Sequence, residues 1–101
     1  MESEKCLTPI DSWCVYRHTS PSGKVYIDIT HYKDPQKRWG KNGILYSKCS
    51  VFYRAIQKYG WNNIKHEILF SELSEERAKN LEVSLIRHYR NLGISYNMTI
   101  G

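Results

Sequence analysis

Four side chains of this sequence have the chemistry needed to act on a phosphodiester: Tyr16, Tyr26, Arg38 and Glu82. The planar guanidinium of an arginine binds two phosphate oxygens at once, and a carboxylate is the usual protein ligand of Mg²⁺ or Mn²⁺. Tyr16 is the best candidate for a general base. Because a free phenol titrates near 10, this role requires a nearby cation, such as Lys24 or Arg38, that favours the phenolate. Tyr26 is then expected to orient the water or a phosphate oxygen.

Each of these residues also has an ordinary structural explanation. The two tyrosines could form a cross-strand aromatic pair, and Arg38 could join an ion pair at the surface. Glu82 lies at the border of an apolar helix stripe, where a carboxylate is seldom buried without a partner, so a structural ion pair could hold it. Taken singly, every one of them favours the structural explanation.

The elements that must position these residues begin with a predicted β-hairpin. Residues 13–18 and 24–29 are rich in aromatic and β-branched side chains and flank the turn-forming residues 19–23. A turn centred on Pro21 would place Tyr16 opposite Tyr26 on one face of the ribbon. The other face would then carry the aliphatic side chains of the second strand, which are Val25, Ile27 and Ile29.

The rest of the sequence predicts helices and a third strand. Asp34 and Pro35 form an N-terminal signal for a short helix over residues 36–39, ended by Gly40 and followed by a glycine-containing loop. Ser50 is a candidate N-cap for a helix over 51–59, and residues 65–70 predict a strand. Ser74 caps a long helix that runs to about Asn91. Its expected inward stripe consists of Ala78, Leu81, Leu85, Ile86, Tyr89 and Leu92.

Composition limits the class of protein. The chain has 101 residues, of which 41% are hydrophobic and 25% charged, so we expect one globular domain over residues 12–101 after a polar leader over 1–11. No apolar run is long enough to span a bilayer and no secretory signal is present, so we expect a soluble cytoplasmic protein without a membrane partner. The cysteines are three in number and widely spaced, which predicts reduced thiols and not a zinc site.

The net charge of +5 makes a polyanionic partner plausible. Lysines cluster around the short helix and the following loop, where aromatic side chains accompany them. The candidate DNA-binding residues are Lys24, Lys37, Trp39, Lys41 and Lys48, and Tyr46 adds aromatic surface beside them. A solvated basic loop explains the same cluster equally well. His18 and His66 are further candidates, for assistance in proton transfer.

The order of these motifs along the chain resembles the GIY-YIG nuclease domain. The resemblance covers residues 13–101 and rests on Cys14-Val15-Tyr16, Tyr26-Ile27, Lys37-Arg38-Trp39, the segment 52–61, Glu82 with Leu85-Ile86, and Tyr96-Asn97. It implies an α+β fold with a small three-stranded antiparallel sheet flanked by helices. It also implies that Tyr16 and Tyr26 are the motif tyrosines, Arg38 the catalytic arginine, Glu82 the ligand of one Mg²⁺ or Mn²⁺ ion, and Asn97 a residue that shapes the site. DNA is the implied substrate.

Two positions depart from the motif, since Cys14 and Asp28 stand where the family has glycines. Asp28 is on the same face as Tyr26, where a carboxylate repels phosphate unless a cation neutralises it. Asp28 could be an extra metal ligand, could point away at a bulge, or could have silenced the site and left a DNA-binding module. We expect activity to survive. Members of the family commonly carry a separate DNA-recognition module, so we expect sequence selectivity to come from a partner, to come from a homodimer, or to be absent. The resemblance also implies a phage or mobile-element origin in a bacterial host.

Overall fold

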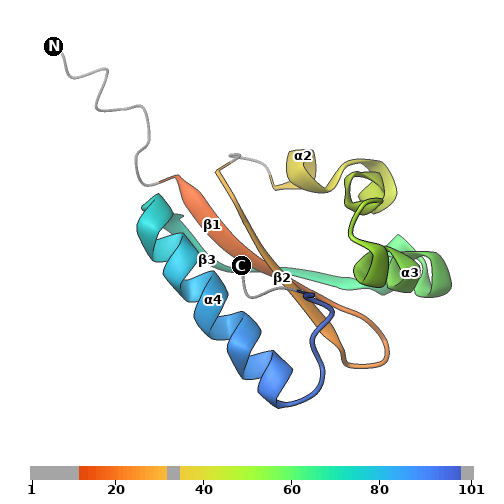
Figure 1. The fold of residues 1–101 in the computed structure, drawn as a ribbon. Coiled ribbons are helices and arrows are strands. Elements are labelled where there is room, and N and C mark those ends of the chain that lie inside the picture. The colour runs from red at the N-terminus through yellow and green to blue at the C-terminus, as the bar shows by residue number, and fades with distance from the viewer. Residues whose placement is uncertain (1–11, 32–34, 99–101) are drawn as a thin grey trace, which may run out of the picture.

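The computed structural model describes residues 12–31 and 35–98, and it confirms an α+β architecture. A three-stranded antiparallel sheet in the order β2-β1-β3 forms its centre (Figure 1). The strands are β1 (Trp13–Thr19), β2 (Val25–Thr30) and β3 (Lys65–Leu73). The helices are α2 (Gln36–Trp39), α3 (Ser50–Tyr59) and α4 (Glu75–Asn91), with short 3₁₀ segments η1 (Lys41–Tyr46) and η2 (Trp61–Asn63). The predicted leader and the predicted cap Asp34 lie outside the described residues.

The predicted hairpin is present, but its register differs from the expected one. The amide of Gly23 donates to the carbonyl of Ser20 at 2.8 Å, and Gly23 has a φ of +90°, a conformation that glycine adopts readily. The turn is therefore centred on Ser22, one residue after Pro21. As a result Tyr16 pairs with Asp28, and Tyr26 pairs with His18. The expectation that Tyr16 faces Tyr26 is wrong, although alternation keeps both on one face.

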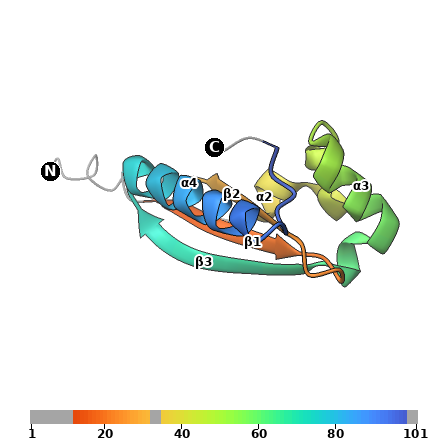
Figure 2. The same ribbon diagram turned by 60° about the horizontal axis from the view of Figure 1, so that its bottom comes forward.

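One face of the sheet packs against α4, which lies lengthwise along it (Figure 2). Val15 and Ile27 form this core together with Ala78 and Ile86 of the helix, all of them fully or nearly fully buried. Ser74 caps α4 as predicted, its side chain accepting from the amide of Arg77 at 3.2 Å. Leu92 departs from the predicted inward stripe. It follows the last helical residue and is 58% exposed.

The opposite face of the sheet packs against α2, η1 and α3 in an aromatic core. Its buried members include Tyr16, Trp39, Tyr46 and Phe52. Trp39 and Tyr46 were expected to offer aromatic surface, but they are 8% and 0% exposed and belong to this core. The short helix 36–39 is confirmed, whereas residues 41–46 form η1 in place of the predicted loop.

The connection between these segments depends on close packing of η1 against η2. Gly43 has a φ of +73°, and a Cβ there would lie 2.5 Å from the Trp61 ring, so this position requires glycine. Helix α3 begins at Ser50 itself, and Cys49 takes the preceding cap position that Ser50 was expected to fill. Within the described residues, no helix is both long enough and apolar enough to cross a membrane.

The free edge of β2 pairs with the segment that follows α4. The amide of Val25 donates to the carbonyl of Ile94 at 2.8 Å, and the amide of Tyr96 donates back to the carbonyl of Val25 at 2.7 Å. This short parallel bridge between Val25 and Ser95 brings the end of the described chain alongside the hairpin. Asn97 is thereby placed beside the strand that carries Tyr26 and Asp28.

Candidate active site

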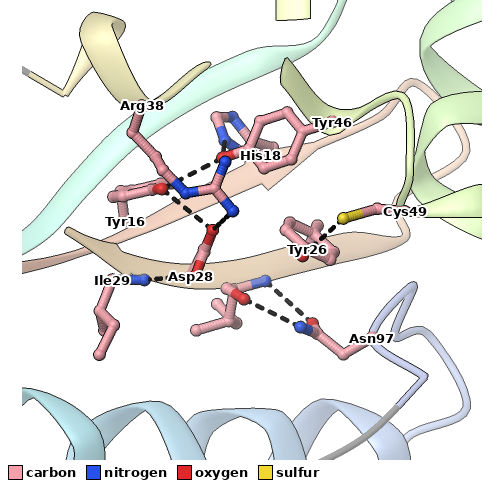
Figure 3. Close-up of polar contacts among 10 residues, drawn as sticks. Tyr16, His18, Tyr26, Asp28, Ile29, Arg38, Tyr46, Cys49 and Asn97 are labelled. Atoms are coloured by element: carbon pink, nitrogen blue, oxygen red, sulfur yellow. Dashed lines mark hydrogen bonds and ion pairs between the residues drawn. The ribbon is translucent and has the colours of Figure 1, made fainter. Parts of the chain in front are cut away.

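Tyr16, Asp28 and Arg38 meet on the face of the sheet opposite α4, although they come from three different elements (Figure 3). The hydroxyl of Tyr16 donates to Asp28 Oδ2 at 3.1 Å, and Arg38 Nη2 lies 2.9 Å from the same oxygen. Asp28 reaches Tyr16 because the observed register pairs these two residues directly, and Arg38 reaches both from α2. A carboxylate thus joins the tyrosine of one strand to the arginine of a separate helix.

The environment of Tyr16 opposes formation of a phenolate. Tyr16 is 0% exposed, and burial raises the pKa of its phenol, with the nearby charge of Asp28 acting in the same direction. The expected cation, Arg38, acts in the opposite direction but is outweighed. Tyr16 therefore keeps its proton at neutral pH and donates a hydrogen bond to Asp28. A protonated phenol of this kind does not fit the role of a free phenolate base.

Asp28 is the member of this cluster with the properties of a base. Its side chain is 14% exposed, and burial raises the pKa of its carboxyl above the ordinary value, although Arg38 and the amide of Ile29 oppose the shift. Oδ2 accepts from Tyr16 and Arg38, whereas Oδ1 accepts from the amide of Ile29 at 2.8 Å. A carboxylate oxygen can accept two hydrogen bonds, so Oδ1 retains capacity for one more donor.

Tyr26 and Asn97 lie next to the cluster without joining it (Figure 3). The Tyr26 ring stacks on Phe52 with centroids 4.5 Å apart, and its hydroxyl lies 3.5 Å from Cys49 Sγ. Burial raises the pKa of the Tyr26 phenol. The Asn97 amide brackets the backbone of Ile27: Oδ1 accepts from its amide at 3.0 Å and Nδ2 donates to its carbonyl at 2.9 Å. Asn97 therefore positions β2.

Glu82 lies on α4, close enough to Asp28 for the two carboxylates to interact. Burial, followed by the charge of Asp28, raises the pKa of Glu82 to about 7. The side chain is half-buried, and it forms no hydrogen bond or ion pair with the described residues. Because Mg²⁺ and Mn²⁺ prefer oxygen ligands and are often held by only one or two carboxylates, this unpartnered carboxylate fits such an ion. Among the described residues, no group of three or more His, Cys, Asp or Glu side chains is arranged to hold a metal ion.

The histidines that were candidates for proton transfer lie behind Tyr16. His18 is 0% exposed, with Nδ1 2.7 Å from His66 Nδ1 and Nε2 3.1 Å from the hydroxyl of Tyr46. Tyr46 in turn donates to the Tyr16 hydroxyl at 3.1 Å. Burial lowers the pKa of His18 to about 2 and lowers that of His66, so His18 is neutral under ordinary conditions. Tyr46 was not predicted to contact the site residues, since its contacts depend on the path of η1.

The candidate DNA-binding residues divide into two groups. Lys24, Lys37, Lys41 and Lys48 are all exposed, as contact with a phosphate backbone requires. Trp39 is buried, and its ring packs edge-on against Tyr16 at 5.4 Å, so it has no free face on which a base could stack. Trp39 therefore contributes to the walls of the site and not to a nucleic-acid surface.

No family model, no curated protein and no solved structure matches the chain.

Proposed function

We propose that this chain is a metal-dependent endonuclease that hydrolyses phosphodiester bonds in DNA. The proposal rests mainly on the convergence of Tyr16, Asp28 and Arg38 at a partly exposed position, with the unpartnered carboxylate of Glu82 nearby. These four residues belong to four different elements. Their types match those that the resemblance to the GIY-YIG nuclease domain assigns to its site, with Asp28 as an addition.

Arg38 is the group that binds the scissile phosphate in this proposal. Its side chain is 31% exposed and the guanidinium lies over the Tyr46 ring, 4.9 Å from the centroid. Nη2 is paired with Asp28, but a guanidinium has five N–H donors, so others remain for phosphate oxygens. The contact with the Tyr46 ring and the ion pair with Asp28 hold the guanidinium in place, which favours a bidentate contact with phosphate and the stabilisation of charge in the transition state.

Asp28 is the general base in this proposal, and Tyr16 is its positioning residue. Asp28 Oδ1 accepts a proton from the attacking water, while the Tyr16 hydroxyl holds Oδ2 in place. A carboxyl whose pKa is raised by burial is a stronger base than an exposed one, which suits this role near neutral pH. In this proposal Asp28, which stands where the motif has a glycine, replaces Tyr16 as the general base.

Glu82 would hold the divalent ion. Its raised pKa implies that the ionised carboxylate is poorly compensated by protein groups, so a cation would favour the ionised form. A bound Mg²⁺ or Mn²⁺ supplies Lewis-acid polarisation of the phosphate and compensates the charge that develops on the leaving oxygen.

A plasmid assay tests this proposal. Supercoiled plasmid is incubated at pH 8 with the wild-type protein and Mg²⁺ or Mn²⁺, alongside Glu82→Gln and the matched control Glu76→Gln, which changes an exposed glutamate in the first turn of the same helix. We expect nicking by the wild type and the control, and a loss of about 100-fold or more in Glu82→Gln. Absence of nicking by the wild-type protein with both ions contradicts the proposal.

One observation favours a second function, that of a catalytically inactive DNA-binding module. Asp28 occupies Nη2 of Arg38 at 2.9 Å and places negative charge where a phosphate would approach. Under this alternative the wild type binds DNA in a salt-sensitive manner without cleaving it, binding persists in Glu82→Ala and Tyr16→Phe, and Asp28→Gly restores nicking. The plasmid assay and a binding titration with these variants separate the two functions.

A further inference from the structure

An unbroken chain of hydrogen-bonding contacts leads from Asp28 through the interior to the other end of the aromatic core. Its members are Asp28, Tyr16, Tyr46, His18 and His66. The first four are visible in Figure 3. The chain ends where His66 Nε2 lies 3.1 Å from the carbonyl oxygen of Trp61, which can only accept.

The chain lacks one proton when Asp28 is ionised and both histidines are neutral. There are five contacts, including the last one to the Trp61 carbonyl, and each needs one proton. Each phenol and each neutral imidazole supplies one proton, so the four side chains between the two ends supply four. A fifth proton, on Asp28 or on His66, satisfies every contact in the chain.

We propose that this chain is a proton relay, in which Asp28 and His66 share one proton through Tyr16, Tyr46 and His18. In one state Asp28 is protonated, His18 carries its proton on Nδ1 and His66 carries its proton on Nε2. Four transfers convert it into the other state: from Asp28 to Tyr16, from Tyr16 to Tyr46, from Tyr46 to His18 Nε2, and from His18 Nδ1 to His66 Nδ1. Asp28 is then ionised and His66 is an imidazolium ion.

Burial of the middle of the chain makes a relay possible. Tyr16, Tyr46 and His18 are each 0% exposed, and the Trp39 ring packs against His18 with centroids 4.9 Å apart. Water is therefore kept away from the three central side chains, whose polar atoms contact one another and the two ends of the chain, Asp28 and His66. The two ends are more open. The side chain of Asp28 is 14% exposed, and His66 lines a surface cavity of about 510 Å³.

At each end of the chain, the neighbouring groups act on the protonation state in opposite directions. Arg38 is paired with Asp28 and favours its ionised form, whereas Glu82 on α4 opposes it. Around His66, β1 contributes His18, η2 contributes the Trp61 carbonyl and ring, and Lys41 of η1 lines the same cavity. Burial lowers the pKa of His66 and favours its neutral form, whereas the Trp61 carbonyl favours the imidazolium form.

The relay gives the proposed nuclease a route for the proton that Asp28 takes from water, and only this use of the relay rests on the proposed function. The proton would leave the site on the side of His66, where the chain reaches a surface cavity. The sharing of a proton between Asp28 and His66 is a property of the protein alone, and it can be measured without DNA.

Histidine ¹⁵N NMR on the full-length labelled chain tests the relay. We compare the pH titration and tautomer of His66 in the wild type, Asp28→Asn, Tyr46→Phe and the double variant. The amide of the substituted asparagine can donate to Tyr16, which satisfies the whole chain with neutral histidines. We therefore expect Asp28→Asn to lower the His66 midpoint and to keep the neutral Nε2–H tautomer to lower pH. Tyr46→Phe interrupts the chain, so Asp28→Asn should have no further effect on His66 in that background.

The control for hydroxyl removal is Tyr53→Phe, since Tyr53 is half-buried in the same core but its hydroxyl forms no hydrogen bond with the described residues. This variant should titrate like the wild type. An equal effect of Asp28→Asn with and without Tyr46 overturns the relay, because it indicates a through-space charge effect. No effect of Asp28→Asn on His66 also overturns it. If the protein cleaves DNA while this coupling is absent, the relay alone is wrong. If the coupling is present without cleavage, the proposed function alone is wrong.

Discussion

At the scale of single residues, Glu82 is the clearest case of a side chain that costs stability. Its carboxyl is half-buried near Asp28, and no cation among the described residues is paired with it. A carboxylate in this position is expected in a protein that binds a cation there, because a purely structural role would favour a partner or a neutral side chain. Under the proposed function, Glu82 lowers the stability of the metal-free protein in exchange for metal binding.

Replacement of Glu82 by Gln should therefore stabilise the metal-free protein at high pH. The folded-state pKa of about 7 lies above the ordinary 4.5, so the wild type loses stability as the pH rises through this window. Glutamine does not ionise, and we expect Glu82→Gln to be more stable than the wild type by about 1–2 kcal/mol at pH 8, after allowance for solvent screening, with no difference near pH 4. Urea unfolding with a chelator present measures this. A variant that is less stable at pH 8 contradicts the assigned environment.

Arg38→Ala should have the opposite effect, because it leaves Asp28 without its cation. Asp28 is the more buried partner, so we expect a loss of about 1–2 kcal/mol at pH 7, which shrinks in acid as Asp28 becomes protonated. Arg54→Ala, on the exposed face of α3, serves as the control and should change stability by less than about 0.5 kcal/mol. Asp28→Asn in the Arg38→Ala background should recover part of the loss, and failure to do so argues against the pair.

At the scale of elements, the sequence predicted types and bounds more reliably than register. The hairpin, the short helix, the third strand and the long helix follow from alternation, caps and turn residues, which are local signals. The pairing of Tyr16 with Asp28 depends on whether the turn centres on residue 21 or 22, and a shift of one residue there moves the pairing by two. The contacts of Tyr46 and the burial of Trp39 depend on how η1 folds back, which no local pattern encodes.

The segment that follows α4 is held against β2 by hydrogen bonds from Asn97, and loss of these bonds should be detectable by amide hydrogen exchange. Asn97→Ala deletes both hydrogen bonds to the backbone of Ile27, at the edge of the sheet. We expect a loss of about 1–2 kcal/mol and faster exchange of the Ile27 amide hydrogen, measured by NMR. Asn62→Ala, at an exposed position in η2, is the control. Unchanged protection of Ile27 would show that Asn97 does not hold β2.

At the scale of the whole molecule, the excess of positive charge is the feature that would govern an encounter with DNA under the proposed function. The net charge is +5, and Lys24, Lys37, Lys41 and Lys48 are exposed. We expect binding of a short DNA duplex, measured by fluorescence anisotropy, to weaken steeply as the salt concentration rises. Replacement of a lysine that contacts a phosphate by alanine should reduce the slope of log K against log salt by about 0.9. Lys58→Ala, in the last turn of α3, serves as a control. Binding that is insensitive to salt contradicts a phosphate-contacting surface.

The most direct test of the central claim is the rate at which Asp28 variants nick supercoiled plasmid with Mg²⁺ at pH 8. If Asp28 is the general base, the wild type nicks the plasmid and both Asp28→Asn and Asp28→Gly are slower by about 100-fold or more. A silent wild type together with an active Asp28→Gly would contradict this account, since Asp28 would then be the residue that blocks Arg38.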